Sequence, residues 1–133
     1  MKKLLLILGM LWLMPALLAA EATPLDKALQ QAKQQHKMVL LMISQEGCPM
    51  CNYMKHNTLK DPKVTAYLRK HYIMTTLDQD FDDIPKRFST FVTPTFFFID
   101  ADTGKIVDEP FRGGAKADAF LRILKIYNND KGK

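Results

Sequence analysis

One run of residues strongly limits the folds that this chain can adopt. Residues 38–44, MVLLMIS, are almost continuously apolar. So short an apolar run is typical of a strand that is buried on both faces of a sheet. A strand of that kind needs other elements packed above and below it. The rest of the chain must therefore supply a covering layer on each face.

Helices before and after this strand are indicated by capping residues and by apolar spacing. Thr23-Pro24 and Asp61-Pro62 each place a helix-capping side chain before a proline, which suits the first helical position. Apolar residues at helical spacing follow each pair. We therefore expect helices at residues 24–36, about 49–59, from 62 onward and 116–128, with a short helix at 84–88.

Further strands complete the predicted sheet. Residues 72–78 indicate a second strand, and residues 95–100 and 105–109 flank the turn sequence ADTG, which predicts a hairpin. Helices that alternate with strands before a closing hairpin indicate an α/β protein, with a mixed central sheet flanked by helices on both faces. A chain of 133 residues with 47% hydrophobic and 25% charged residues fits one globular domain.

The first twenty residues have the layout of a secretory signal peptide. Two lysines are followed by an apolar run over residues 4–18 and then by small alanines. The run is shorter than the roughly twenty residues that span a bilayer, and Pro15 interrupts it. We predict cleavage after residue 20 or 22, a single mature domain over 21–133, and a periplasmic location. Disulfides form and persist in that compartment.

The charge of the chain argues against a nucleic-acid partner. The formal net charge is +5, and it falls to +3 without residues 1–20, which hold two lysines and no acid. The remaining basic residues are scattered among acidic ones rather than clustered. The acidic residues between 78 and 83 match no calcium-loop spacing, so we expect a solvated loop there.

The only two cysteines, Cys48 and Cys51, lie just after the buried strand, in SQEGCPMCNYM. A zinc site would need more ligands. Haem attachment would need a histidine where Asn52 stands. A purely structural disulfide would close a loop too short to stabilise the fold much. A redox pair or a soft-metal site remains.

The spacing of the cysteines favours the redox pair. Pro49 would begin a helix, which puts Cys48 at a helix N-terminus, where free N–H groups stabilise a thiolate. Cys51 would lie one turn further on the same side and can form a disulfide with Cys48. We therefore assign Cys48 as the attacking thiol and Cys51 as the resolving thiol.

A second motif lies far along the chain. In FVTPTFFF, Pro94 precedes an apolar strand, where a proline suits only the start of the strand. The buried strand, the C-x-x-C at a helix start and Thr93-Pro94 before a hairpin together resemble the thioredoxin superfamily over residues 24–128. Among relatives, EGCPMC (46–51) followed by LKDPKV (59–64) looks most like exported thioredoxin-like proteins that resemble the terminal domain of the membrane thiol-reductant conduit. The resemblance implies a thioredoxin fold, with a cis Pro94 against the cysteine pair.

The resemblance also implies a function. We expect a monomeric, cofactor-free thiol–disulfide oxidoreductase that reduces or exchanges disulfides of cell-envelope proteins, in preference to an oxidase or an isomerase. Its donor would be a membrane protein's cysteine pair. The resemblance implies that the backbone of Thr93 pairs with the substrate chain. We expect further substrate contacts from Pro49, Met50 and Pro94. For Phe91 and Val92 two interpretations stay open, the border of the substrate groove or packing in the core.

One departure from the family concerns proton transfer. Cytosolic thioredoxins carry a buried aspartate six residues before the first cysteine, and Met42 stands there in this chain. Either another group assists Cys51 or proton transfer is slower. Glu46 is a candidate for that group, and the simpler interpretation makes it a solvated loop residue.

The alternative function is copper binding. Cys48, Met50, Cys51 and Met54 place four sulfur atoms close together, and His56 adds a nitrogen. Such soft ligands suit Cu(I). The simpler interpretation puts Met54 in the core and leaves Met50 exposed beside the cysteines, where its flexible side chain can contact varied substrates.

Overall fold

The computed structural model describes residues 21–130, so the predicted signal peptide over residues 1–20 lies outside the described residues. Within the described part, no helix combines the length and the apolar character needed to cross a membrane. The elements, in chain order, are α1 (Pro24–Gln35), β1 (Met38–Ser44), α2 (Pro49–His56), the 3₁₀ turn η1 (Thr58–Lys60), α3 (Pro62–His71), β2 (Tyr72–Asp78), the 3₁₀ turn η2 (Lys86–Phe88), β3 (Thr95–Ile99), β4 (Phe111–Arg112) and α4 (Ala117–Asn129).

The four strands form one mixed sheet in the order β2-β1-β3-β4. β1 pairs in parallel with β2 and antiparallel with β3, and β3 pairs antiparallel with β4. All seven residues of β1 are buried, as their apolar run predicts. The predicted mixed sheet is therefore confirmed, with the strand of residues 38–44 inside it.

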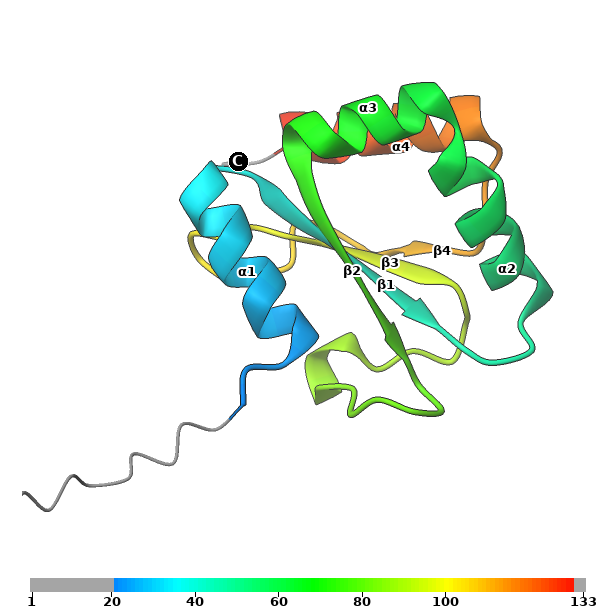
Figure 1. The fold of residues 1–133 in the computed structure, drawn as a ribbon, viewed down its shortest axis with the longest axis horizontal. Coiled ribbons are helices and arrows are strands. Elements are labelled where there is room, and N and C mark those ends of the chain that lie inside the picture. The colour runs from blue at the N-terminus through cyan, green and yellow to red at the C-terminus, as the bar shows by residue number, and fades with distance from the viewer. Residues whose placement is uncertain (1–20, 131–133) are drawn as a thin grey trace, which may run out of the picture.

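Side chains of β1 alternate between two hydrophobic clusters, one on each face of the sheet. Val39, Leu41 and Ile43 pack with α1 and η2, whereas Leu40 and Met42 pack with α2, α3 and α4. Figure 1 shows α3 running beside α4, with α1 set apart from them across the sheet. Both predicted covering layers are present.

The two capping signals work as the sequence predicts. The Thr23 hydroxyl accepts a hydrogen bond from the Asp26 N–H at 3.1 Å, and the Asp26 carboxylate accepts one from the Thr23 N–H at 3.0 Å. Hydrogen bonds from Thr23 lower the pKa of Asp26. The Asp61 carboxylate accepts from the N–H groups of Lys63 and Val64 at the start of α3.

The prediction of a hairpin strand over residues 105–109 is wrong. The turn after β3 does form, and the Val107 N–H donates to the Phe98 carbonyl at 2.7 Å. The ladder then stops because Asp108 adopts a left-handed backbone with φ of 58° and Pro110 has no N–H to donate. Pairing with β3 resumes only at the two-residue β4.

The hydroxyl of Tyr72 anchors α4 to the sheet, and its removal tests that contact. It donates a 2.7 Å hydrogen bond to the carbonyl of Leu124, and burial raises the pKa of the phenol. Tyr72→Phe is expected to lower the free energy of unfolding by about 1 kcal/mol, measured by urea denaturation. Tyr53→Phe, at an exposed position, is the control and should change it little. Equal effects of the two variants would contradict the anchoring role.

Candidate active site

Cys48 and Cys51 form a disulfide where β1 passes into α2. Gly47 makes this passage possible, because its φ of 70° is a conformation that side chains disfavour. Cys48 is the N-cap of α2, and its sulfur accepts a hydrogen bond from the Cys51 N–H at 3.1 Å. Cys51 is fully buried, whereas Cys48 is only partly buried. Of the two sulfurs, Cys48 is the one that a partner can reach.

The Thr93–Pro94 peptide bond is cis, as the resemblance implies, and it lies against the disulfide. The Thr93 carbonyl oxygen is 3.6 Å from Cys48 Sγ. The Pro94 carbonyl accepts from the Gly113 N–H at 2.8 Å. The proline thus directly precedes β3, and its carbonyl binds the segment that follows β4.

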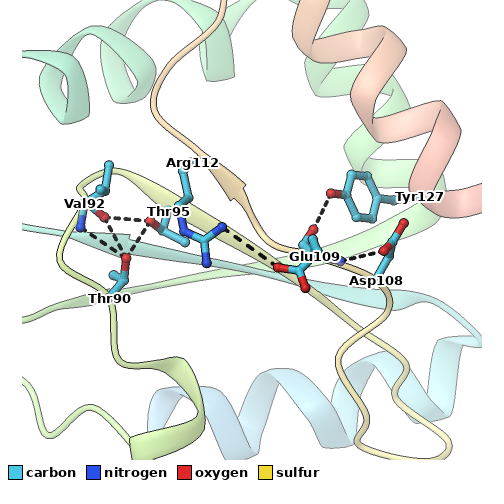
Figure 2. A network of polar contacts seen from close by, with 7 residues as sticks. All are labelled: Thr90, Val92, Thr95, Asp108, Glu109, Arg112 and Tyr127. Atoms are coloured by element: carbon cyan, nitrogen blue, oxygen red, sulfur yellow. Dashed lines mark hydrogen bonds and ion pairs between the residues drawn. The ribbon is translucent and has the colours of Figure 1, made fainter.

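A cluster of threonine hydroxyls fixes the loop that precedes Pro94 (Figure 2). The hydroxyl of Thr95 donates to the Val92 carbonyl at 2.6 Å, and the Val92 N–H donates to the Thr90 hydroxyl at 3.2 Å. The two hydroxyls lie 3.1 Å apart. Both backbone groups of Val92 are therefore bound within the loop, while the Phe91 side chain is left fully in solvent, at 105% exposure. Sequence reasoning missed Thr90 and Thr95, although threonines flanking a proline loop were the available signal.

A third segment, residues 113–116, closes the other side of the site. Met50 and Tyr53 of α2 line a shallow hollow of about 260 Å³ with Gly114, Ala115 and Lys116. The Ala115 N–H donates to Met54 Sδ at 3.4 Å. The sequence alone does not predict that this segment borders the site.

The predicted substrate-contact residues lie together around the disulfide. Pro49 and Met50 are exposed on the first turn of α2, Thr93 is partly buried and Pro94 is buried. We call the surface formed by Pro49, Met50, Val92 and Thr93 the binding rim. Its exposed side chains are mostly apolar, and Met50 and Val92 are each 44% exposed. Exposed apolar groups that gather in one place commonly mark a binding surface.

The candidate copper ligands divide between the core and the surface. Met54 is buried, and its sulfur is already a hydrogen-bond acceptor. His56 is exposed at the end of α2, where its Nδ1 lies 2.9 Å from the Asn52 carbonyl. Within residues 21–130, no three His, Cys, Asp or Glu side chains are grouped to hold a metal ion. Met54 thus belongs to the core, and Met50 lies exposed beside the cysteines, as the simpler interpretation predicts.

Glu46, the candidate proton-transfer residue, lies in the turn before Cys48. Its side chain is exposed, whereas Cys51 is fully buried. Its backbone N–H donates to the Asp80 carboxylate at 3.2 Å, which ties the turn to the loop after β2. Glu46 therefore anchors the turn through its backbone.

A second polar group of contacts joins β4, the segment that precedes it and α4. Figure 2 shows Glu109 between Arg112 and Tyr127. The Tyr127 hydroxyl donates to the Glu109 carbonyl, and the exposed Arg112–Glu109 ion pair spans 4.0 Å. An exposed pair at this distance contributes little stability. A larger hollow of about 620 Å³ lies nearby, lined by hairpin residues and Asp130. Neither cysteine lines it.

The fold and the disulfide together define a class of protein. A mixed sheet between helical layers, a C-x-x-C disulfide at a helix start and an adjacent cis-proline are the features of a thioredoxin-fold thiol–disulfide oxidoreductase. Residues 25–128 match the family described as thioredoxin-like domain. The chain belongs to this family, and the resemblance seen in the sequence is confirmed.

Solved structures with the same fold include several thiol–disulfide proteins. A thioredoxin from Thermus thermophilus is 26% identical with a TM-score of 0.70, over 82% of this chain and 87% of that chain. The reduced C-terminal domain of DsbD from Neisseria meningitidis is 25% identical with a TM-score of 0.62, over 81% of this chain and 97% of that domain. A disulphide isomerase from Xylella fastidiosa is 25% identical with a TM-score of 0.55, over 86% of this chain and 95% of that chain. No curated protein sequence matches the chain.

The close approach of Met50 to Gly114 leads to a prediction. A Cβ atom at Gly114 would lie 2.2 Å from Met50 Sδ, so Gly114→Ala must displace the Met50 side chain. Because that side chain is flexible and exposed, the free energy of unfolding should fall by less than about 1 kcal/mol. Methyl NMR should show a large shift of the Met50 signal, with that of Met74 on β2 unchanged. An unmoved Met50 signal would contradict the contact.

Proposed function

We propose that this protein is a periplasmic thiol–disulfide oxidoreductase that reduces or exchanges disulfides of cell-envelope proteins. In this proposal Cys48 is the nucleophile, Cys51 is the resolving thiol, and Pro49, Met50, Thr93 and Pro94 contact the substrate. The observation that carries the assignment is the asymmetry of the disulfide. Cys48 is the accessible N-cap of α2, while Cys51 is fully buried behind it.

The proposed reaction has two exchange steps. The Cys48 thiolate attacks a substrate disulfide, which forms a mixed disulfide and releases the first substrate thiolate. The Cys51 thiolate then attacks Cys48 Sγ, which closes the Cys48–Cys51 disulfide and releases the second. The substrate gains two electrons, and the protein's dithiol loses them. The disulfide seen in the structure is the end state of this reaction.

Two contacts of Cys48 with opposite electrostatic effects support a reductant or exchanger. The Cys51 N–H at 3.1 Å stabilises a thiolate at Cys48, together with the start of α2. The Thr93 carbonyl oxygen at 3.6 Å opposes a negative charge on the same sulfur. A strong oxidant depends on a greatly stabilised thiolate. The partial cancellation at Cys48 favours a more reducing pair.

The proposed location and donor rest on the N-terminal sequence and on the compartment. A cleaved signal peptide over residues 1–20 would deliver the mature domain, 21–133, to the periplasm. A reductant there must receive its electrons through the membrane, so we propose a membrane protein's cysteine pair as the donor. One of the similar structures is the C-terminal domain of DsbD from Neisseria meningitidis.

Trapping of mixed disulfides tests the assignment of the two thiols. Cys51→Ala leaves the attacking thiol in place and removes the resolving one, so mixed disulfides with cell-envelope proteins should accumulate. They would be isolated under non-reducing conditions and identified by mass spectrometry. Cys48→Ala is the matched control and should trap none. The assignment is wrong if the two variants trap alike.

The direction of electron flow has its own test. A reductant is expected to hold Cys48 and Cys51 mainly as thiols in the cell, which a thiol-reactive mass tag added to acid-quenched cells would show. A pair found mainly as a disulfide, in cells whose envelope donors are intact, would instead favour an oxidase.

The exposed Phe91 provides a test of substrate binding. Its side chain is fully solvated, and it precedes by two residues Thr93, whose carbonyl oxygen lies 3.6 Å from Cys48 Sγ, so an apolar side chain near the substrate cysteine could bury it. Phe91→Ala is expected to raise KM for a protein disulfide by about fivefold, with kcat unchanged. Reduction of a small aromatic disulfide should be unaffected.

Ile126→Ala is the matched control for Phe91→Ala, because Ile126 is an exposed apolar residue on α4 at 57% exposure. Both variants remove one exposed apolar side chain. If Phe91→Ala slowed the small disulfide as much as the protein substrate, Phe91 would shape the loop rather than bind substrate.

A further inference from the structure

The hydroxyl of Ser44 is a buried polar group without a partner. Ser44 is the last residue of β1 and is fully buried. Within residues 21–130, its Oγ is the one buried side-chain nitrogen or oxygen atom that makes no hydrogen bond. A buried hydroxyl of this kind is costly and calls for an explanation.

The alternation of β1 places this hydroxyl on the face that carries Cys51. Leu40 and Met42 belong to the same hydrophobic cluster as Cys51, and Ser44 follows them on that face. Ser44 is also two residues nearer than Met42 to the turn that leads into α2. Its carbonyl accepts from the Gln79 N–H at 3.0 Å, so its backbone is held in place.

We propose that Ser44 serves the resolving step by donating a hydrogen bond to the Cys51 sulfur once the disulfide is open. This inference rests on the proposed function, in which Cys51 resolves the mixed disulfide. In the oxidised protein the Cys51 sulfur is bonded to Cys48 and is neutral, so it offers the Ser44 hydroxyl no charged acceptor. In the mixed disulfide the buried Cys51 must ionise, and a hydroxyl is the kind of group that stabilises a buried thiolate.

The step balances without any added reagent. Cys51 gives up its thiol proton to solvent, and the Ser44 hydroxyl donates a hydrogen bond to the resulting thiolate. The thiolate attacks Cys48 Sγ, the Cys48–Cys51 bond forms, and the bond from Cys48 to the substrate sulfur breaks. The substrate sulfur leaves with the electron pair and takes up a proton from water. Ser44 itself is unchanged.

Few charged groups surround this end of the sheet. Asp78 on β2 pairs with Ser44 in the register and is half-buried, but its carboxylate already accepts from the Asp80 N–H at 3.0 Å. Asp80 and Glu46 are exposed in the adjoining loops. On the β3 side of β1, the charged residue is Arg112 of β4, which pairs with Thr95 of β3. The core face of α2 presents Cys51 and Met54, neither of them charged in the oxidised protein.

The test separates the two exchange steps in time. Reduced protein is mixed with dithiobis(nitrobenzoate), which releases one coloured thiolate when Cys48 attacks and a second when Cys51 resolves. Ser44→Ala is expected to leave the first phase unchanged and to slow the second about tenfold at neutral pH, the smallest effect expected for a hydrogen bond to a charged group. As the pH rises and a larger share of Cys51 ionises without help, the second-phase rate of Ser44→Ala should move towards that of the parent protein.

Two further variants make the result decisive. Ser44→Thr keeps a hydroxyl and should retain most of the second-phase rate, whereas Ser89→Ala removes an exposed serine and should change neither phase. An unchanged second phase in Ser44→Ala, or an equal slowing of both phases, overturns the role of Ser44. Cys51→Ala must lose the second phase. If the parent protein itself shows no second phase, the proposed function fails instead.

Discussion

The antiparallel pairing of β1 with β3 is the constraint on which the rest of the site depends. β1 leads the chain towards Cys48, and Pro94, which directly precedes β3, lies 46 residues further along the sequence. In the ladder Ile43 lies opposite Thr95, which brings the Thr93 carbonyl to 3.6 Å from Cys48 Sγ. A slip of one residue would turn every side chain of β1 to the opposite face. Burial on both faces therefore fixes the register, and the register assembles the site.

Much of this arrangement could be predicted because the signals were local. The apolar run of β1, the two cap-and-proline pairs and the spacing of Cys48 and Cys51 each act within a few residues of sequence. The end of the hairpin could not be predicted in the same way. KIVDE has the composition of a strand, but the left-handed backbone at Asp108 and the missing N–H of Pro110 break its ladder.

Contacts between segments that are distant in the chain could not be predicted from the sequence either. Nothing near Gly114 in the chain indicates that Met50 lies against it, because the contact depends on how α2 packs over the segment after β4. The hydroxyl cluster of Thr90 and Thr95 depends in the same way on the path of the loop around Pro94. Residue types and local spacing predicted the chemistry, whereas packing determined the shape of the binding rim.

The two cysteines need control of their charge from different sources. The N-terminus of α2 directs its free N–H groups at the N-cap, which is Cys48, and the Cys51 N–H already donates there. The same helix cannot serve Cys51 in this way, because Cys51 lies inside the first turn and its side chain faces the core. Help for the resolving thiol has to come from the sheet beneath it. With an apolar side chain at Met42, the nearest polar position on that face of β1 is Ser44.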